Sequence, residues 1–337
     1  MEREATHAMQ PRRELITIRD NVAQIKQALA DLVLQPRLSA LKWSGITRQT
    51  PNIKVGYPGQ HLASLIAGME GERTGARGND LCDGSEVKSC SRIDQLDICE
   101  SCGAAVARVE LLCPACNSDQ IQRKNDSKWL FTIRSKDDLK LLTEQVPRIV
   151  FLLGDYPYFE QENYDVLRFQ AFEIWPRSPR QRRFAELMSN YYHNIYRVHK
   201  NASPNKTPAP KNFWPYSYQF YICNPIRTFA CEVHDANSRP RISLLQYIEP
   251  DADRSASPSV AMPRDLIEPG ELNAIVSAAS VEELRSDAGS GADAARRGSK
   301  QQIAEHIREV GEALRNYLPL RDDRTASART RYSRRTR

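Results

Sequence analysis

Two acidic residues and a lysine lie close together near residue 85, and their types and spacing suit hydrolysis of a phosphodiester bond. Glu86 and Lys88 are two positions apart in a stretch typical of a strand, so their side chains share one face. Asp83-Gly84 is a strong signal for a tight hairpin turn, which would fold Asp80 back beside Glu86. Carboxylates are suitable ligands for Mg²⁺, and a nearby lysine can orient the attacking water or offset phosphate charge. We therefore expect catalysis by Asp80, Glu86 and Lys88, with Mg²⁺ held by Asp80 and Glu86.

The chain contains two other acid-x-Lys triplets, which test how specific this pattern is. Asp126-Ser-Lys128 lies in a polar turn, and Asp138-Leu-Lys140 lies where a helix is expected to begin. Neither has a further acid presented across a hairpin, so only the first triplet has the context of a catalytic site. The alternative interpretation, a surface hairpin with solvated charges, stays open because charged residues are mostly exposed.

Two Cys-x-x-Cys pairs follow the hairpin, separated by ten residues. This spacing is typical of a tetrahedral zinc site in which each pair forms a tight knuckle. Four thiolates leave no open coordination position, so we expect structural Zn²⁺ that folds an inserted ribbon over residues 97–120. The predicted zinc ligands are Cys99, Cys102, Cys113 and Cys116. The other cysteines, Cys82, Cys90, Cys223 and Cys231, lack such pairing and are expected in the core.

The pattern Asp80-x5-Glu86-x-Lys88, preceded by a predicted helix over 59–70, resembles the PD-(D/E)xK nuclease superfamily. Over roughly residues 15–235 the chain is similar to the MamI type of type II restriction endonucleases. The resemblance implies Mg²⁺-dependent cleavage of double-stranded DNA at an interrupted palindrome, GATNNNNATC, within a restriction-modification system whose DNA methyltransferase acts on the same site. The usual proline before the first acid is Asn79 here, so Asp83 remains a possible Mg²⁺ ligand in place of Asp80.

A palindromic target implies a homodimer, because cutting both strands of a two-fold site calls for two symmetry-related active sites. A second hypothesis assigns a different class of function: a non-catalytic zinc-ribbon regulator that binds DNA, in which Glu86 and Lys88 are only surface charges. Cleavage of plasmid DNA in the presence of magnesium separates the two hypotheses.

The surrounding elements alternate between helix and strand. We expect strands at 129–133, 148–153, 166–174 and 218–222, and helices at 137–145 and 178–200. These predict an α/β (α+β) fold with a restriction-endonuclease-like mixed sheet flanked by helices, the zinc ribbon inserted, and a helical C-terminal region. A capping box at Thr17 predicts a helix that ends at Pro36. The expected division is an N-terminal helical segment (1–50, its first 14 residues disordered), a nuclease core (51–235) and a C-terminal region (236–337).

The helix over 178–200 and the loop after it are the candidate DNA contacts. The helix has an apolar stripe and a basic face, and arginine matches phosphate oxygens well. The loop offers lysines and asparagines that can read base edges, although a solvated basic face explains the same pattern. The candidate contacts are Arg180, Arg182, Arg183, Asn205, Lys206, Lys211 and Asn212.

The net charge of +6 is concentrated at the C-terminus. Residues 321–337 hold seven arginines and two aspartates, so this tail carries +5 and the rest of the chain about +1. We expect a basic arm that adds nonspecific, salt-sensitive DNA affinity. Before it, a Gly/Ser/Ala linker near 287–292 precedes an apolar repeat that predicts one amphipathic helix over 303–318. No long apolar run or signal peptide is present, which favours the cytoplasm.

Overall fold

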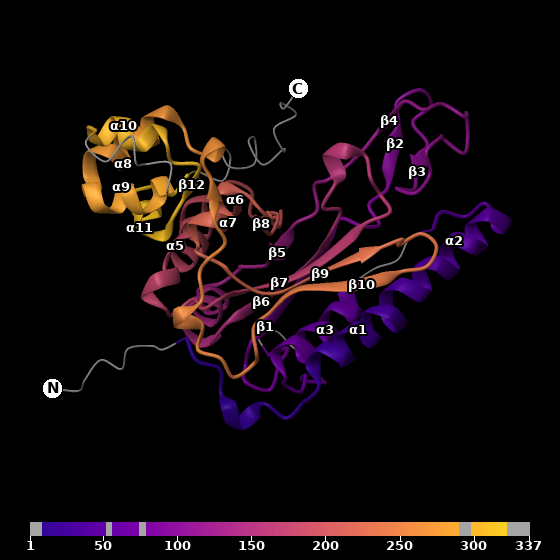
Figure 1. The fold of residues 1–337 in the computed structure, drawn as a ribbon, viewed down its shortest axis with the longest axis horizontal. Coiled ribbons are helices and arrows are strands. Elements are labelled where there is room, and N and C mark those ends of the chain that lie inside the picture. The colour runs from indigo at the N-terminus through magenta and orange to yellow at the C-terminus, as the bar shows by residue number, and fades with distance from the viewer. Residues whose placement is uncertain (1–8, 52–55, 74–78, 290–297, 322–337) are drawn as a thin grey trace.

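A five-stranded mixed sheet forms the centre of the protein in the computed structural model, which describes residues 9–51, 56–73, 79–289 and 298–321 (Figure 1). The strands are ordered β1-β6-β7-β9-β10. β1 pairs with β6 in parallel, and the other pairs are antiparallel. Their bounds are β1 (Glu86–Ser91), β6 (Ile149–Asp155), β7 (Leu167–Ile174), β9 (Ile226–His234) and β10 (Arg241–Tyr247).

Helices cover both faces of this sheet, so the expected architecture is confirmed. On one face, α1 and α3 pack against Val87, Val150 and Phe169 from three strands. The helices on this side are α1 (Asn21–Leu29), the π-helical turn η2 (Ala30–Leu34), α2 (Gln35–Thr47) and α3 (Gly56–Ala67). In Figure 1, α1 and α3 lie below the sheet, and α2 extends from them toward the right. All seven residues of β6 are buried, because the strand is central and both of its faces are covered.

The opposite face packs against the second half of the chain. Phe151 and Phe172 of the sheet share one apolar cluster with Phe184, Leu284 and Leu314. The helices here are α4 (Lys136–Lys140), η3 (Leu141–Gln145), η5 (Pro179–Gln181), α5 (Arg183–Asn190), η6 (Tyr191–Tyr196), α6 (Arg197–Ala202), α7 (Tyr218–Ile222), α8 (Pro269–Ala278), α9 (Val281–Ala288), α10 (Lys300–Glu305) and α11 (Glu312–Arg315). The C-terminal helices therefore dock on the central sheet, and the sheet itself extends beyond residue 235 to β10.

Three smaller sheets complete the structure. Two short strands beside β1 pair as β5 (Trp129–Phe131) and β8 (Lys211–Phe213), and β11 (Met262–Pro263) pairs with β12 (Glu309–Val310). The ribbon between β1 and β6 in the sequence contains β2 (Asp97–Cys99), β3 (Ala105–Val106) and β4 (Ile121–Gln122). It projects away from the sheet, well apart from the C-terminal helices in Figure 1. Among the described residues, no helix is long and apolar enough to cross a membrane.

Several expected elements are wrong, each for a local reason. Residues 218–222 form helix α7 instead of a strand, because Ser217 caps its first turn by accepting a hydrogen bond from the Phe220 amide. The predicted helix over 303–318 is divided into α10, β12 and α11, because β12 pairs with β11. The apolar positions of that repeat are nevertheless buried: Ile303, Ile307, Val310, Leu314 and Leu318.

The N-terminal predictions also need correction. Thr17 caps no helix: its amide donates to the carbonyl of Gly68, and α1 begins at Asn21. Pro36 does not end the helix, which continues to Thr47 through the π-helical turn η2. Proline lacks an amide hydrogen and its ring crowds the preceding turn, and a wider turn accommodates both. Residues 9–14, expected to be disordered, are ordered in part by Met9, which packs beside Trp175 and Ile226. Residues 1–8, 290–297 and 322–337, which include half of the predicted linker and most of the basic arm, lie outside the described residues. The first two residues of that linker, Asp287 and Ala288, instead end helix α9.

Candidate active site and cysteine cluster

The predicted reversal before β1 is present. The Gly84 amide donates to the carbonyl of Leu81 at 2.8 Å, and Gly84 has φ +86°, a conformation that glycine adopts without strain. The amides of Asp80 and Leu81 both donate to the carbonyl of Ser85, at 2.9 and 3.1 Å. The chain therefore turns back on itself between Asp80 and Glu86, as the Asp83-Gly84 pair predicts.

Asp80 is held directly against the strand that carries the other two residues. Its carboxylate accepts a hydrogen bond from the Val87 amide at 2.7 Å. Burial raises the pKa of Asp80 and the charge of Glu86 raises it further, while the Val87 bond and Lys88 act in the opposite direction; the net pKa shift is upward. Asp80, Glu86 and Lys88 therefore form one electrostatic group.

Glu86 and Lys88 lie on the face of β1 opposite to Val87, which is buried toward α1 and α3. Their side chains form an ion pair. The Lys88 ammonium also lies 5.7 Å from the ring centre of Phe131. The side chains of Glu86 and Lys88 are 14% and 27% exposed, so both are accessible from solvent and yet partly shielded. This arrangement can accept a cation and a phosphate from the solvent side.

Asp83, the alternative metal ligand, is placed differently. It is buried, and one of its oxygens accepts a hydrogen bond from the Ser85 amide at 3.0 Å. The other oxygen forms an ion pair with the guanidinium of Arg148 at 3.2 Å. Both oxygens of Asp83 are thus engaged inside the protein.

The sequence analysis did not identify Gln60, which also contacts the site. Gln60 lies on α3, and its side-chain amide donates to the second carboxylate oxygen of Asp80 at 3.3 Å. The neighbouring Gly59 allows this contact, because a Cβ there would lie only 2.0 Å from Ser89 Oγ on β1. No sequence signal singled out Gln60, which is one of several polar residues on α3.

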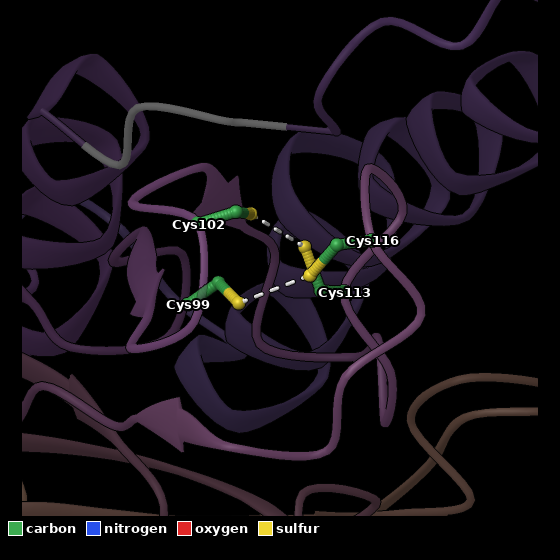
Figure 2. Close-up of side chains that lie close together, drawn as sticks. All are labelled: Cys99, Cys102, Cys113 and Cys116. Carbon is green, nitrogen blue, oxygen red and sulfur yellow. Dashed lines mark hydrogen bonds between the residues drawn. The ribbon is translucent and has the colours of Figure 1, made fainter.

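The four predicted zinc ligands converge in the ribbon (Figure 2). All four sulfur atoms lie within 4.8 Å of one another, and every cysteine of the chain is a free thiol. The closest approaches join Cys99 to Cys116 at 3.5 Å and Cys102 to Cys113 at 3.6 Å. The donor set and its tight spacing fit a four-thiolate zinc site.

Each pair of cysteines forms the same kind of turn. The Gly103 amide donates to the carbonyl of Cys99, and the Asn117 amide donates to the carbonyl of Cys113, both at 2.9 Å. Gly103 and Asn117, which directly follow the second cysteine of each pair, both have positive φ angles. Glycine and asparagine are the residues best suited to that conformation, so the sequence itself selects two equivalent knuckles.

The ribbon is fixed to the rest of the protein by a buried charge cluster. Asp97 is fully buried and pairs with Arg108 at 2.7 Å and with Arg123 at 2.9 Å. The Arg108 guanidinium lies over the rings of Tyr156 and Tyr164, each with its centre at 5.4 Å. These contacts hold the base of the ribbon against the loop that follows β6.

The three arginines predicted to contact DNA fall into two groups. Arg180 binds Glu312 and the backbone carbonyls of residues 254, 255 and 257. Arg183 binds the carbonyls of Asn316 and Leu318. These two side chains attach η5 and α5 to the C-terminal region. The side chain of Arg182 is 61% exposed, and within the described part of the chain its one ion pair is a long contact of 3.5 Å with Glu186.

The loop candidates are also divided. Asn205 and Lys206 are exposed, and Asn212 lies half-buried on β8. Lys211 is buried, and its ammonium donates to the Gln219 side chain at 2.7 Å. Lys206 is therefore free to approach a phosphate, whereas Lys211 has a structural contact inside the protein.

Comparison with known proteins gives two matches. A family model described as MamI restriction endonuclease matches residues 42–265, which include the candidate site and the ribbon. One curated relative, the Type II restriction enzyme MamI of Microbacterium ammoniaphilum, is 33% identical over 89 residues, or 26% of this chain. That match spans 29% of the relative's length. No solved structure matches.

Proposed function

This chain belongs to the MamI restriction endonuclease family, and from that premise we propose that it is a type II restriction endonuclease that hydrolyses phosphodiester bonds in double-stranded DNA. The observation that carries the proposal is the hydrogen bond from the Val87 amide to Asp80, which holds this carboxylate beside Glu86 and Lys88. The proposed target is GATNNNNATC, the site that the family resemblance implies.

Asp80 and Glu86 are the proposed ligands of Mg²⁺. Their chemistry fits, because the two carboxylates share a partly shielded surface, on which burial and the charge of Glu86 both raise the pKa of Asp80. When bound, Mg²⁺ would polarise the phosphate and lower the pKa of a bound water. Asp83 is not assigned this role, since both of its oxygens are engaged with Ser85 and Arg148.

Lys88 is proposed to orient the attacking water and to offset negative charge that develops on the phosphate. Its ion pair with Glu86 keeps the ammonium at the site before DNA arrives. Gln60 is proposed to orient the Asp80 carboxylate from the opposite side to Val87.

The cysteine cluster is proposed to bind one structural Zn²⁺ through Cys99, Cys102, Cys113 and Cys116. Eight free cysteines suit a reducing compartment, so we propose the cytoplasm as the location. A homodimer is proposed, because the target is two-fold symmetric. The proposed restriction-modification system also includes a DNA methyltransferase that modifies the same site.

Plasmid cleavage tests the proposal. With Mg²⁺, the wild type should give discrete fragments from plasmid that carries the target, and Lys88→Ala and Glu86→Ala should lose cleavage by at least about a hundredfold. Lys140→Ala is the matched control, because Lys140 is the exposed lysine of another acid-x-Lys triplet, on α4, and this variant should cut normally. Plasmid that is bound but left intact by the wild type would favour the zinc-ribbon regulator instead.

A further inference from the structure

Arg148 holds both sides of the turn that presents the candidate active site. It directly precedes β6 and is fully buried. Its guanidinium donates to Ser85 Oγ at 3.0 Å and pairs with Asp83 at 3.2 Å. Its backbone carbonyl accepts the Glu86 amide at 3.1 Å. One residue therefore contacts the turn with its side chain and the first residue of β1 with its main chain.

Ser85 transmits this restraint to Asp80. It is fully buried, and its carbonyl accepts the amides of Asp80 and Leu81. Its own amide donates to Asp83 at 3.0 Å. The position of Ser85 is thus set by Arg148 and Asp83, and the backbone of Asp80 is set by Ser85.

The restraint belongs to a buried network with two charges of each sign. Glu173 on β7 pairs with Arg148 and with Arg254, each at 3.2 Å. Although burial opposes ionisation, these two guanidinium groups lower the pKa of Glu173. Asp83 is the second carboxylate of the network and pairs with Arg148. Fully paired networks in a low dielectric are rigid, and an unpaired member is costly, so the turn is fixed in one position.

We propose that Arg148 and Asp83 are positioning residues of the active site. They keep Ser85 in place so that the Asp80 carboxylate stays on the Val87 amide, next to Glu86. The Asp83 side chain acts through the turn and does not hold the metal. The effect of these residues on cleavage rests on the proposed nuclease function. Their effect on the position of the turn can be tested separately.

Hydrogen-deuterium exchange tests the structural part. Ser85→Ala removes the contact with Arg148 Nε without leaving a buried charge. Asp83→Asn removes the carboxylate charge that pairs with Arg148. In both variants the amides of residues 79–88 should exchange roughly tenfold faster, while residues 149–153 of β6 stay protected. Asp155→Asn is the matched control, because Asp155 is a buried carboxylate paired with Arg168 elsewhere on the sheet, and it should leave 79–88 unchanged. The inference would be overturned if the amides of residues 79–88 exchanged at the wild-type rate in folded Ser85→Ala, or if Asp155→Asn accelerated their exchange equally.

Magnesium dependence tests the functional part. Ser85→Ala and Asp83→Asn should need about tenfold more Mg²⁺ for half-maximal cleavage, and Asp155→Asn should not. A purely structural role would reduce the fraction of active protein without changing the Mg²⁺ requirement, so an unchanged requirement would overturn the positioning role. If the wild type cuts no DNA, the nuclease proposal fails. The exchange result still decides whether Arg148 and Asp83 fix the position of the turn.

Discussion

The Val87 amide donates a 2.7 Å hydrogen bond to the Asp80 carboxylate, and this bond joins the residue before the turn to the strand after it. Asp80 and Val87 are seven positions apart, and the bond brings Asp80 beside the face of β1 that carries Glu86 and Lys88. The proposed metal site depends on this contact more than on any other.

The close contact between α3 and β1 should support cleavage. In Gly59→Ala the new Cβ would overlap Ser89 Oγ, so α3 must shift and move Gln60 away from Asp80. We expect unfolding to become easier by about 1–2 kcal/mol and cleavage to fall by roughly tenfold. Chemical denaturation and plasmid cleavage measure the two effects.

Gly45→Ala is the matched control for that substitution. Gly45 also lies inside a helix, α2, but a Cβ there has open space around it. This change should stabilise the protein by about 0.5–1 kcal/mol and leave cleavage unchanged. Equal behaviour of the two variants would show that the Gly59 contact has no special role.

The ribbon should contain one zinc ion per chain. Elemental analysis should detect that ion in the wild type and lose it in Cys99→Ser, because three thiolates no longer complete the tetrahedron. Cys82→Ser changes a cysteine outside the cluster and should retain the zinc. Full zinc content in Cys99→Ser would contradict the assignment.

Stability should depend on pH through Asp94. Burial raises the pKa of Asp94 from 3.8 to about 6, although Arg37 and Arg108 lower it. The folded protein then holds a proton that the unfolded chain releases between about pH 4 and 6, so this group makes the unfolding free energy decrease as pH rises through that window. The decrease is at most about 3 kcal/mol.

Asp94→Asn should remove this contribution. Urea denaturation of both proteins at several pH values between 4 and 7 measures it as a difference in slope. Parallel curves for the wild type and Asp94→Asn would show that Asp94 titrates normally in the folded protein.

Arg182 and Arg180 should behave differently although both were predicted to contact DNA. Arg182→Ala should weaken DNA binding and reduce the slope of log affinity against log salt by about one. Arg180→Ala should chiefly destabilise the protein, because Glu312 and three backbone carbonyls lose their partner. Binding measured over a range of salt concentrations, with thermal melts, separates the two effects; an unchanged salt slope in Arg182→Ala contradicts its assignment to phosphate contact.

The sequence predicted those features that depend on local rules. The turn at Asp83-Gly84, the alternation across Val87 and the two cysteine knuckles each follow from residues within a few positions of one another. The mixed sheet was also predictable, because its buried strands are apolar runs separated by helical segments.

The features that the sequence did not predict depend on tertiary contacts. The aromatic run at 218–222 has strong strand propensity, but the cap at Ser217 and burial on all sides make it a helix. The contact of Gln60 with Asp80 joins positions 20 residues apart. Similarly, no local pattern distinguishes Arg180 and Arg183, which bind the C-terminal region, from the exposed Arg182.

The location of a bound divalent ion tests the central claim most directly. Manganese accepts the same carboxylate ligands as magnesium, and its anomalous scattering locates it in crystals soaked with Mn²⁺. We predict a peak within about 2.0–2.4 Å of carboxylate oxygens of both Asp80 and Glu86, which is absent in crystals of Asp80→Asn. A wild-type protein that cuts DNA but places the ion elsewhere, or at Asp83, would contradict the account.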